Sequence, residues 1–207
     1  MNKKEAIKII VNCAEKYKNN LVGNNILFVY YDKKAKQYRF FETLFTSSNF
    51  MHFTGVVCKE GINANDFFRK CCTRKLAESD FDFRTDGTTV MKLMVLPEII
   101  NIHKASKMTG RFNSSGLSLY TERLAGNVKG CMGFVRENEF FVPNTVLNQD
   151  IRQSIYGPQY RIVAVFRKNN NDKFYSELVY IAKNIDIKEI QSGEEITAKV
   201  DFESILS

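Results

Sequence analysis

The stretch ILFVYYDKKAKQYRFFETLF, residues 26–45, indicates which fold this chain of 207 residues adopts. Residues 26–32 are a continuous apolar run rich in aromatic and β-branched side chains, which is typical of a strand buried on both faces. The polar segment 32–37 predicts a hairpin turn, and residues 38–45 are expected to return as the partner strand. An antiparallel β pair is therefore predicted early in the chain.

Helical patterns lie on both sides of this pair. Residues 3–20 repeat apolar side chains at three- and four-residue steps with lysines between them, which predicts an amphipathic helix. Asn63 or Asn65 is expected to cap a helix over DFFRKCCTRKL. A second helical candidate, VMKLMVLPEIINIHKAS, follows and is expected to kink at Pro97.

From residue 107 onwards the pattern changes to short strands separated by turn signals. The strand candidates are KMTGRF, LSLYT, KGCMGFV, EFFVPN, YRIVAVFRK and KFYSELVYIAK. The predicted fold class is α+β, with helices packed on one face of a twisted antiparallel sheet. A single domain over residues 1–207 is expected, made of an amino-terminal helix and β pair (1–57), a helical segment (63–106), an antiparallel meander (107–183) and an acidic tail (184–207).

Composition and cysteine usage favour a cytoplasmic protein. Hydrophobic residues make up 44% of the chain, which is enough for a real core. No uncharged apolar run approaches about 18 residues, so no membrane span is expected. The five cysteines lack the C-x-x-C spacing of a zinc site and are interpreted as reduced, mostly buried thiols.

The net charge of +7 is unevenly distributed. Residues 1–39 and 101–170 carry an excess of Lys and Arg, whereas residues 171–207 carry an excess of acids. Two basic segments are what a polyanion-binding face needs once they fold together. The alternative interpretation is that these lysines and arginines only solvate the surface.

Common enzyme fingerprints are missing. The sequence contains no G-x-x-x-x-G-K-[ST], G-x-G-x-x-G, G-x-S-x-G or H-E-x-x-H motif, and neither a metal site nor a cofactor is expected. RNA cleavage by the substrate's own 2′-hydroxyl needs only a base, an acid and fixed cations or donors around phosphorus. Histidine, lysine, arginine, tyrosine, serine and threonine supply all of these.

The first group of candidate residues lies in SSNFMHFTG, residues 47–55. If residues 50–57 are extended, His52 and Thr54 point to the same side of a strand. An imidazole suits acid or base duty, and a threonine hydroxyl can bind a phosphate oxygen. Ser47 and Asn49 are candidate substrate contacts beside them. The alternative is a structural histidine that is hydrogen-bonded beneath a loop.

The second group opens the β-rich half. Lys107 and Arg111 alternate onto one face of an extended KMTGRF and supply cations. Tyr120, Thr121 and Arg161 are expected to extend the same polar face from neighbouring strands, where they would bind substrate.

Seven blocks of the sequence, over roughly residues 5–185, resemble a protein family that is encoded in phages, prophages and their Firmicute hosts. These blocks are SNFMHFTGV, NANDFFRKC, DGTTVMKLMVLPEIINIHKASKMTGRFN, LYTERLAGN, CMGFV, FVPNT and RIVAVF. The family is the phage-associated family of the barnase–EndoU–colicin–RelE (BECR) nucleases. The resemblance implies a metal-independent RNase fold with its active face on the sheet. The family's N-F-x-H-x-T-G pattern places His52 and Thr54 among the candidates, and a second block contains Lys107 and Arg111.

Together these observations predict a cytoplasmic, metal-independent endoribonuclease of phage or mobile-element origin. Its expected partner is RNA, with tRNA or ribosome-bound RNA as candidate targets, or a host nucleoprotein complex. His52 is expected to act as base or acid, Thr54 as phosphate ligand, and Lys107 and Arg111 as stabilisers of charge on phosphorus. Tyr120 is a candidate acid or stacking platform.

Two other classes of function fit the same residues. One is a non-catalytic phage protein that binds nucleic acid or inhibits a host-defence complex on the same scaffold. The other is transfer of ADP-ribose or nucleotide groups. In all cases His52 lacks an evident second group for proton transfer.

Overall fold

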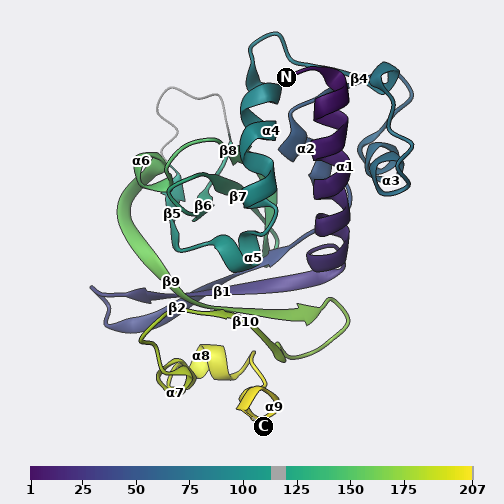
Figure 1. The fold of residues 1–207 in the computed structure, drawn as a ribbon. Helices are drawn as coiled ribbons and strands as arrows, with labels where there is room; N and C mark the ends of the chain where they lie inside the picture. Colours follow the sequence, from purple (N-terminus) through teal and green to yellow (C-terminus); the bar gives the residue numbers. More distant parts are fainter. Residues whose placement is uncertain (113–119, 207) are drawn as a thin grey trace.

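The predicted hairpin forms the middle of the structure (Figure 1). In the computed structural model, which describes residues 1–112 and 120–206, β1 (Asn24–Asp32) pairs antiparallel with β2 (Gln37–Leu44). Phe28 lies opposite Phe41 and their rings stack at 4.8 Å between centroids. Nearly every residue of β1 is buried, so the prediction of a strand covered on both faces is confirmed.

The hairpin belongs to an eight-stranded, mostly antiparallel sheet with the order β1-β2-β8-β7-β6-β5-β9-β10. Its later strands are β5 (Met108–Phe112), β6 (Arg123–Gly126), β7 (Cys131–Glu137), β8 (Phe140–Leu147), β9 (Ile155–Asn169) and β10 (Glu177–Ile181). One pair is parallel, between β2 and β8 at Thr43 and Phe141. The long strand β9 pairs with β5 through its first half and with β1 and β10 through its second. Its pairing with β1 closes the strand order on itself.

Helices α1 to α5 lie on one side of this sheet, where α3 packs on α1 and α2 (Figure 1). They are α1 (Lys3–Asn20), α2 (Asn49–Thr54), α3 (Ala64–Cys72), α4 (Thr88–Ile99) and α5 (Ile102–Ala105). Asn2 and Glu5 form a capping box at the start of α1, and Asn63 caps α3 through Asp66 N. A small second sheet pairs β3 (Val57–Cys58) with β4 (Phe81–Asp82) after the 3₁₀ turn η1 (Glu78–Asp80), and α6 (Ile151–Ser154) precedes β9. The predicted α+β class and antiparallel sheet are confirmed.

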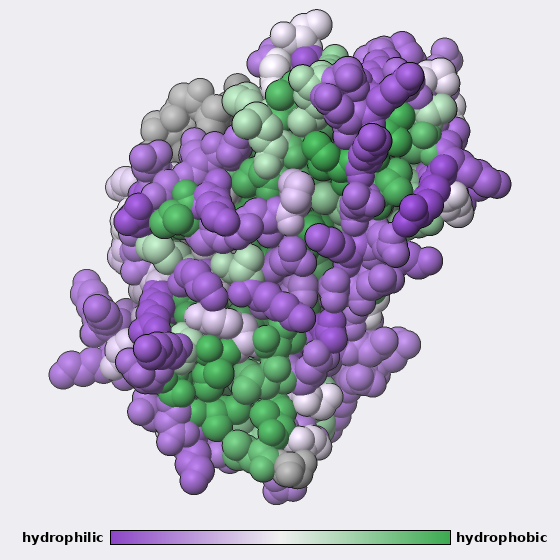
Figure 2. All heavy atoms as spheres, in the orientation of Figure 1, coloured by the Kyte–Doolittle hydropathy of each residue, from purple (hydrophilic) through white to green (hydrophobic). Residues whose placement is uncertain are grey.

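Residues 184–207 carry more structure than the composition of an acidic tail suggests. Within the described part of this segment, α7 (Ile187–Gln191), α8 (Glu194–Thr197) and α9 (Phe202–Leu206) lie on the opposite side of β1 and β9 (Figure 1). Ile190, Ile196 and Phe202 pack in one cluster with Leu27 and Val29 of β1. A strand that is apolar on both faces needs cover on both, and these short helices supply the second layer. Hydrophobic residues also gather on the surface at this end of the chain (Figure 2).

Three local expectations need correction. Residues 49–54 form helix α2 and not a strand, and only Val57 and Cys58 pair as β3. The second helical candidate splits after Ile99 into α4 and α5, with Pro97 inside the last turn of α4. Strand β6 was not predicted, while LSLYT falls partly outside the described residues, and its Tyr120 and Thr121 are not in a strand.

Candidate active site

Helix α2 forms because its sequence supplies both ends and one apolar face. Asn49 Oδ1 accepts hydrogen bonds from Thr46 N at 2.9 Å and from Thr46 Oγ1 at 2.8 Å, which fixes the turn into the helix. Phe50 and Phe53 are three residues apart, both fully buried, and both contact the ring of Tyr17. Gly55 ends the helix with a φ of 66°, a left-handed conformation that glycine adopts without strain.

This helical geometry overturns the argument that placed His52 and Thr54 on one face of a strand. Thr54 is fully buried, and its hydroxyl donates to Met51 O at 2.8 Å and accepts from Val56 N at 3.3 Å. That hydroxyl therefore closes the end of α2. The imidazole of His52 is exposed and makes no hydrogen bond to any described residue.

Helix α4 brings a lysine to the end of α2. Lys92 Nζ donates to the backbone oxygen of His52 at 2.7 Å, and Thr89 Oγ1 donates to Gly55 O at 2.6 Å. A Cβ on Gly55 would meet Lys92 Cδ at 3.0 Å and Thr89 Cα at 3.3 Å, so glycine permits this close approach. The sequence did not identify Lys92 as a candidate. Lys92 and His52 are 40 residues apart in the chain, and only the packing of α2 on α4 brings them together.

The imidazole of His52 and the amine of Lys92 differ in protonation state near neutral pH. Partial burial, and then the charge of Lys92, lower the pKa of His52 below its usual 6.5, although the side chain remains accessible to solvent. Burial, and then the charge of Arg84, lower the pKa of Lys92 to about 8, against the smaller opposing effect of Asp86. Near neutral pH the imidazole is therefore mostly neutral while the neighbouring amine is still mostly protonated.

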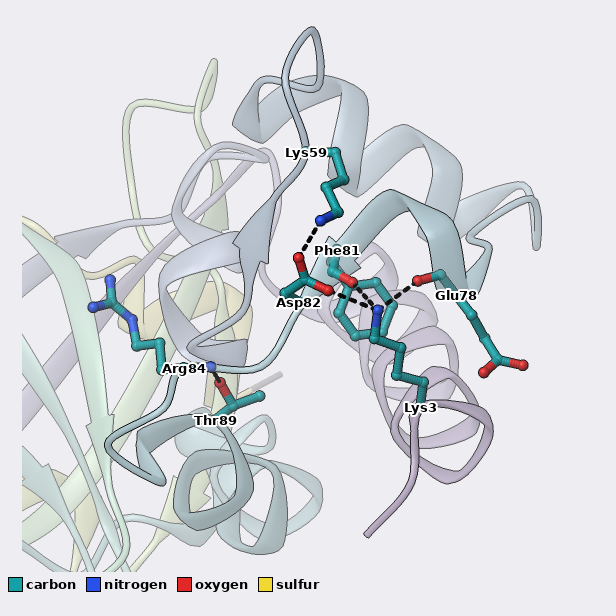
Figure 3. Close-up of polar contacts among 7 residues, drawn as sticks. All are labelled: Lys3, Lys59, Glu78, Phe81, Asp82, Arg84 and Thr89. Atoms are coloured by element: carbon teal, nitrogen blue, oxygen red, sulfur yellow. Dashed lines mark hydrogen bonds and ion pairs between the residues drawn. The ribbon is translucent and has the colours of Figure 1, made fainter.

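Arg84 adds a positive charge that forms no ion pair with a described residue, although it contributes to lowering the pKa of Asp86. Its backbone N–H donates to Thr89 Oγ1 at 2.9 Å, while its guanidinium points away from Asp82 (Figure 3). Asp82 is instead held by Lys3 at 2.9 Å and by Lys59, which together lower its pKa to about 2. His52, Lys92 and Arg84 are called the His52 site below.

The remaining predicted residues fall into two places. Ser47 Oγ donates to Asn65 Oδ1 at 2.7 Å beside α2. On the strands, the Lys107 ammonium lies 3.8 Å from the ring centroid of Tyr180, and Arg161 donates to Lys183 O at 3.0 Å. Tyr120 is 77% exposed and contacts Glu122, whereas the nearly buried Thr121 hydroxyl donates to Asn144 Oδ1 at 3.1 Å.

Arg111 is exposed on β5, directly opposite Arg123. Within residues 1–112 and 120–206, no hydrogen bond or ion pair joins the His52 site to the predicted residues at positions 107, 111, 120, 121 and 161.

The second histidine lies apart from this site. His103 is 1% exposed in α5, and burial followed by the charges of Lys104 and Arg167 lowers its pKa to about 4. It is therefore neutral at ordinary pH.

Two kinds of feature are absent from residues 1–112 and 120–206. No group of three or more His, Cys, Asp or Glu side chains is arranged to hold a metal ion. None of the helices there combines the length and apolar character needed to cross a membrane.

The antiparallel sheet and the helical layer on it define an α+β domain. The chain belongs to the phage-Barnase-EndoU-ColicinE5/D-RelE like nuclease4 family, whose model matches residues 9–184. Comparisons with curated proteins and with solved structures found no match. The resemblance stated from the sequence blocks is confirmed, and membership in a nuclease family implies a nucleic-acid substrate.

Proposed function

We propose that this protein is a metal-independent endoribonuclease whose proton-transfer groups are His52 and Lys92. The observation that carries the proposal is an exposed imidazole of lowered pKa beside a lysine whose pKa is about 8. Pairs of groups whose surroundings push their pKa values apart are a recurring basis for acid–base catalysis near neutral pH. Family membership supplies the nucleic-acid substrate, and the proposal adds that the substrate is RNA.

The reaction follows from the two protonation states. The neutral His52 imidazole takes the proton of the ribose 2′-hydroxyl, and the 2′ oxygen attacks the adjacent phosphorus. The bond between phosphorus and the 5′ oxygen breaks, and the Lys92 ammonium gives that oxygen a proton. The products are a 2′,3′-cyclic phosphate and a 5′-hydroxyl end. Water returns both groups to their starting states by exchanging one proton with each.

Arg84 stabilises the additional negative charge on the phosphate oxygens in the transition state. A guanidinium that forms no ion pair with a described residue is available for this task, and its charge also keeps the pKa of Lys92 low. Thr54 acts indirectly in this mechanism, because its buried hydroxyl holds the end of α2 and so the position of His52. Lys107 and Arg111 belong to the strand surface, where they contact RNA away from the cleaved bond.

The test uses purified protein and total RNA in EDTA, followed by analysis of the new ends. Discrete fragments ending in 2′,3′-cyclic phosphate support the proposal. His52→Ala should lower the cleavage rate by about 10²- to 10⁴-fold while RNA binding is kept. RNA retention without any cleavage by the wild type would favour the non-catalytic binder, and unchanged cleavage by His52→Ala would remove the assignment of the base.

A further inference from the structure

Three neighbouring strands place arginines on one face of the sheet. Arg111 of β5 lies opposite Arg123 of β6, and Arg123 lies opposite Phe134 of β7, two residues before Arg136. Residues opposite one another, or two apart on a strand, point to the same face, so the three arginines share it. They are called the arginine row below.

The arginine row lacks acidic partners among the residues that the structure describes. Half of the ten arginines form an ion pair with Asp or Glu, at residues 39, 69, 74, 152 and 167. All three members of the arginine row belong to the other half. Like charges directly across a strand pair destabilise a sheet, so an uncompensated Arg111–Arg123 pair needs a reason.

Arg123 is held in place by aromatic rings. Its guanidinium carbon lies 5.4, 4.8 and 5.5 Å from the ring centroids of Tyr30, Phe41 and Phe141, and one of its N–H groups donates to Thr109 Oγ1 at 3.5 Å. Cation–π contacts orient a guanidinium without neutralising its charge. Arg123 is half-buried, whereas Arg111 and Arg136 on either side of it are exposed.

An exposed ring completes this surface. Tyr156 of β9 lies opposite Arg111 and is 70% exposed. An aromatic face beside cations suits an unpaired base stacked next to its own phosphates. Neighbouring strands are about 4.8 Å apart and residues two apart on one strand are about 7 Å apart, so the arginine row spans about 12 Å. This length exceeds the axial spacing of adjacent phosphates, about 3.4 Å in B-DNA, so the row can meet more than one phosphate.

The groove beside the β1–β2 hairpin is a poorer site for a polyanion. It has a volume near 1500 Å³ and is lined by cations of the hairpin, including Lys33 and Lys34, but also by Glu189, Glu194 and Glu195. Its mixed charge contrasts with the unpaired cations of the arginine row.

We propose that the arginine row and Tyr156 bind an unpaired nucleic-acid strand, with the arginines on successive phosphates and the tyrosine ring on a base. The inference rests on the proposed function only in taking a nucleic acid as the ligand. It requires no cleavage and no contribution from the His52 site.

The experiment measures binding of a fluorescent deoxythymidine oligonucleotide, which lacks the 2′-hydroxyl and cannot be cut by the proposed route. Three phosphate contacts predict a slope of about −2 for log K against log salt concentration, at roughly −0.7 per contact on a single strand. Arg111→Ala/Arg136→Ala should bring the slope to about −0.7 and weaken binding at low salt. Tyr156→Ala should weaken binding about tenfold with the slope unchanged.

Arg69→Ala/Arg74→Ala is the matched control, because both of those exposed arginines lie in or just after α3 and are ion-paired to Asp66 and Glu15. A slope and an affinity for Arg111→Ala/Arg136→Ala equal to those of this control would overturn the proposal. So would tighter binding of a duplex than of the single strand. Arg123→Lys tests the half-buried arginine of the arginine row without leaving a large void. This variant should bind the oligonucleotide more weakly, while its thermal unfolding stays cooperative. Loss of RNA cleavage in His52→Ala with this binding intact would separate the two proposals.

Discussion

The pairing of His52 with Lys92 predicts the pH dependence of RNA cleavage. Activity should rise as His52 loses its proton, at a pH below 6.5, and fall again as Lys92 loses its own at a pH of about 8. One pH unit above the pKa of a general acid leaves roughly a tenth of it protonated, so the rate at pH 9 should be about tenfold below the plateau. The descending limb is specific to lysine in this position, since an ordinary lysine titrates near 10.5.

Substitution of Lys92 should change the dependence of the cleavage rate on pH in two ways. Lys92→Met removes the acid and should lower cleavage by about 10²- to 10⁴-fold and abolish the limb near pH 8. It also removes a positive charge that lowers the pKa of His52, so the ascending limb should move to higher pH. Lys92→Arg keeps the charge but supplies no titratable proton near neutrality, and it should share the rate loss.

The assay is the initial rate of cleavage of a fluorescent RNA oligonucleotide from pH 5 to pH 10 at constant ionic strength. Lys75→Met is the matched control, because Lys75 is exposed on the surface and forms no ion pair with a described residue. A wild-type rate that stays level from pH 7.5 to pH 9.5, or a Lys92→Met rate equal to that of Lys75→Met, would refute the role of Lys92. Circular dichroism of each variant checks that the fold is retained.

Three substitutions test the helix that carries His52. Gly55→Ala should destabilise the protein by about 1–2 kcal/mol in urea unfolding, because alanine at a φ of 66° is strained and its Cβ would crowd Lys92. An unchanged unfolding midpoint would contradict this. Thr54→Val should cost about 1–3 kcal/mol through lost buried hydrogen bonds, yet kcat/KM of the folded fraction should stay near the wild-type value. A large loss of kcat/KM at full folding would instead restore Thr54 as a phosphate ligand. Phe50→Ala should cost about 3–5 kcal/mol because this ring is fully buried against Tyr17, Phe67 and Phe68, whereas Tyr156→Ala should change the unfolding free energy little.

Helices and strands could be predicted from the sequence where local residue patterns alone determine them. The alternation and apolar run of the hairpin, the spacing of residues 3–20 and the Asn63 cap each specify an element without help from distant residues. Residues 49–54 were misread because a short aromatic run fits a strand as well as a helix. The end residues Asn49 and Gly55 favoured the helix, since one fixes its entry and the other its left-handed exit.

The candidate site was predictable in part. His52 was identified from the sequence and the family pattern, and the structure leaves its imidazole exposed. Lys92 and the arginine row were not identified, because their significance depends on which segments pack together. Strand β6 is four residues long and contains Gly126, so its local signal is weak, and its partners β5 and β7 complete the pairing.

From the residues alone we could predict the α+β class, the central hairpin and a strand β1 covered on both faces, and could propose His52 as a candidate. These depend on hydrophobic periodicity and on residue chemistry, which act over a few neighbouring positions. Long-range packing was needed to bring the acidic carboxyl-terminal segment onto β1 as a second layer, to bury the Thr54 hydroxyl at the end of α2, and to place Lys92 beside His52. Those outcomes depend on burial and on contacts between distant segments, and the same contacts set the pKa of Lys92 by removing its amine from water.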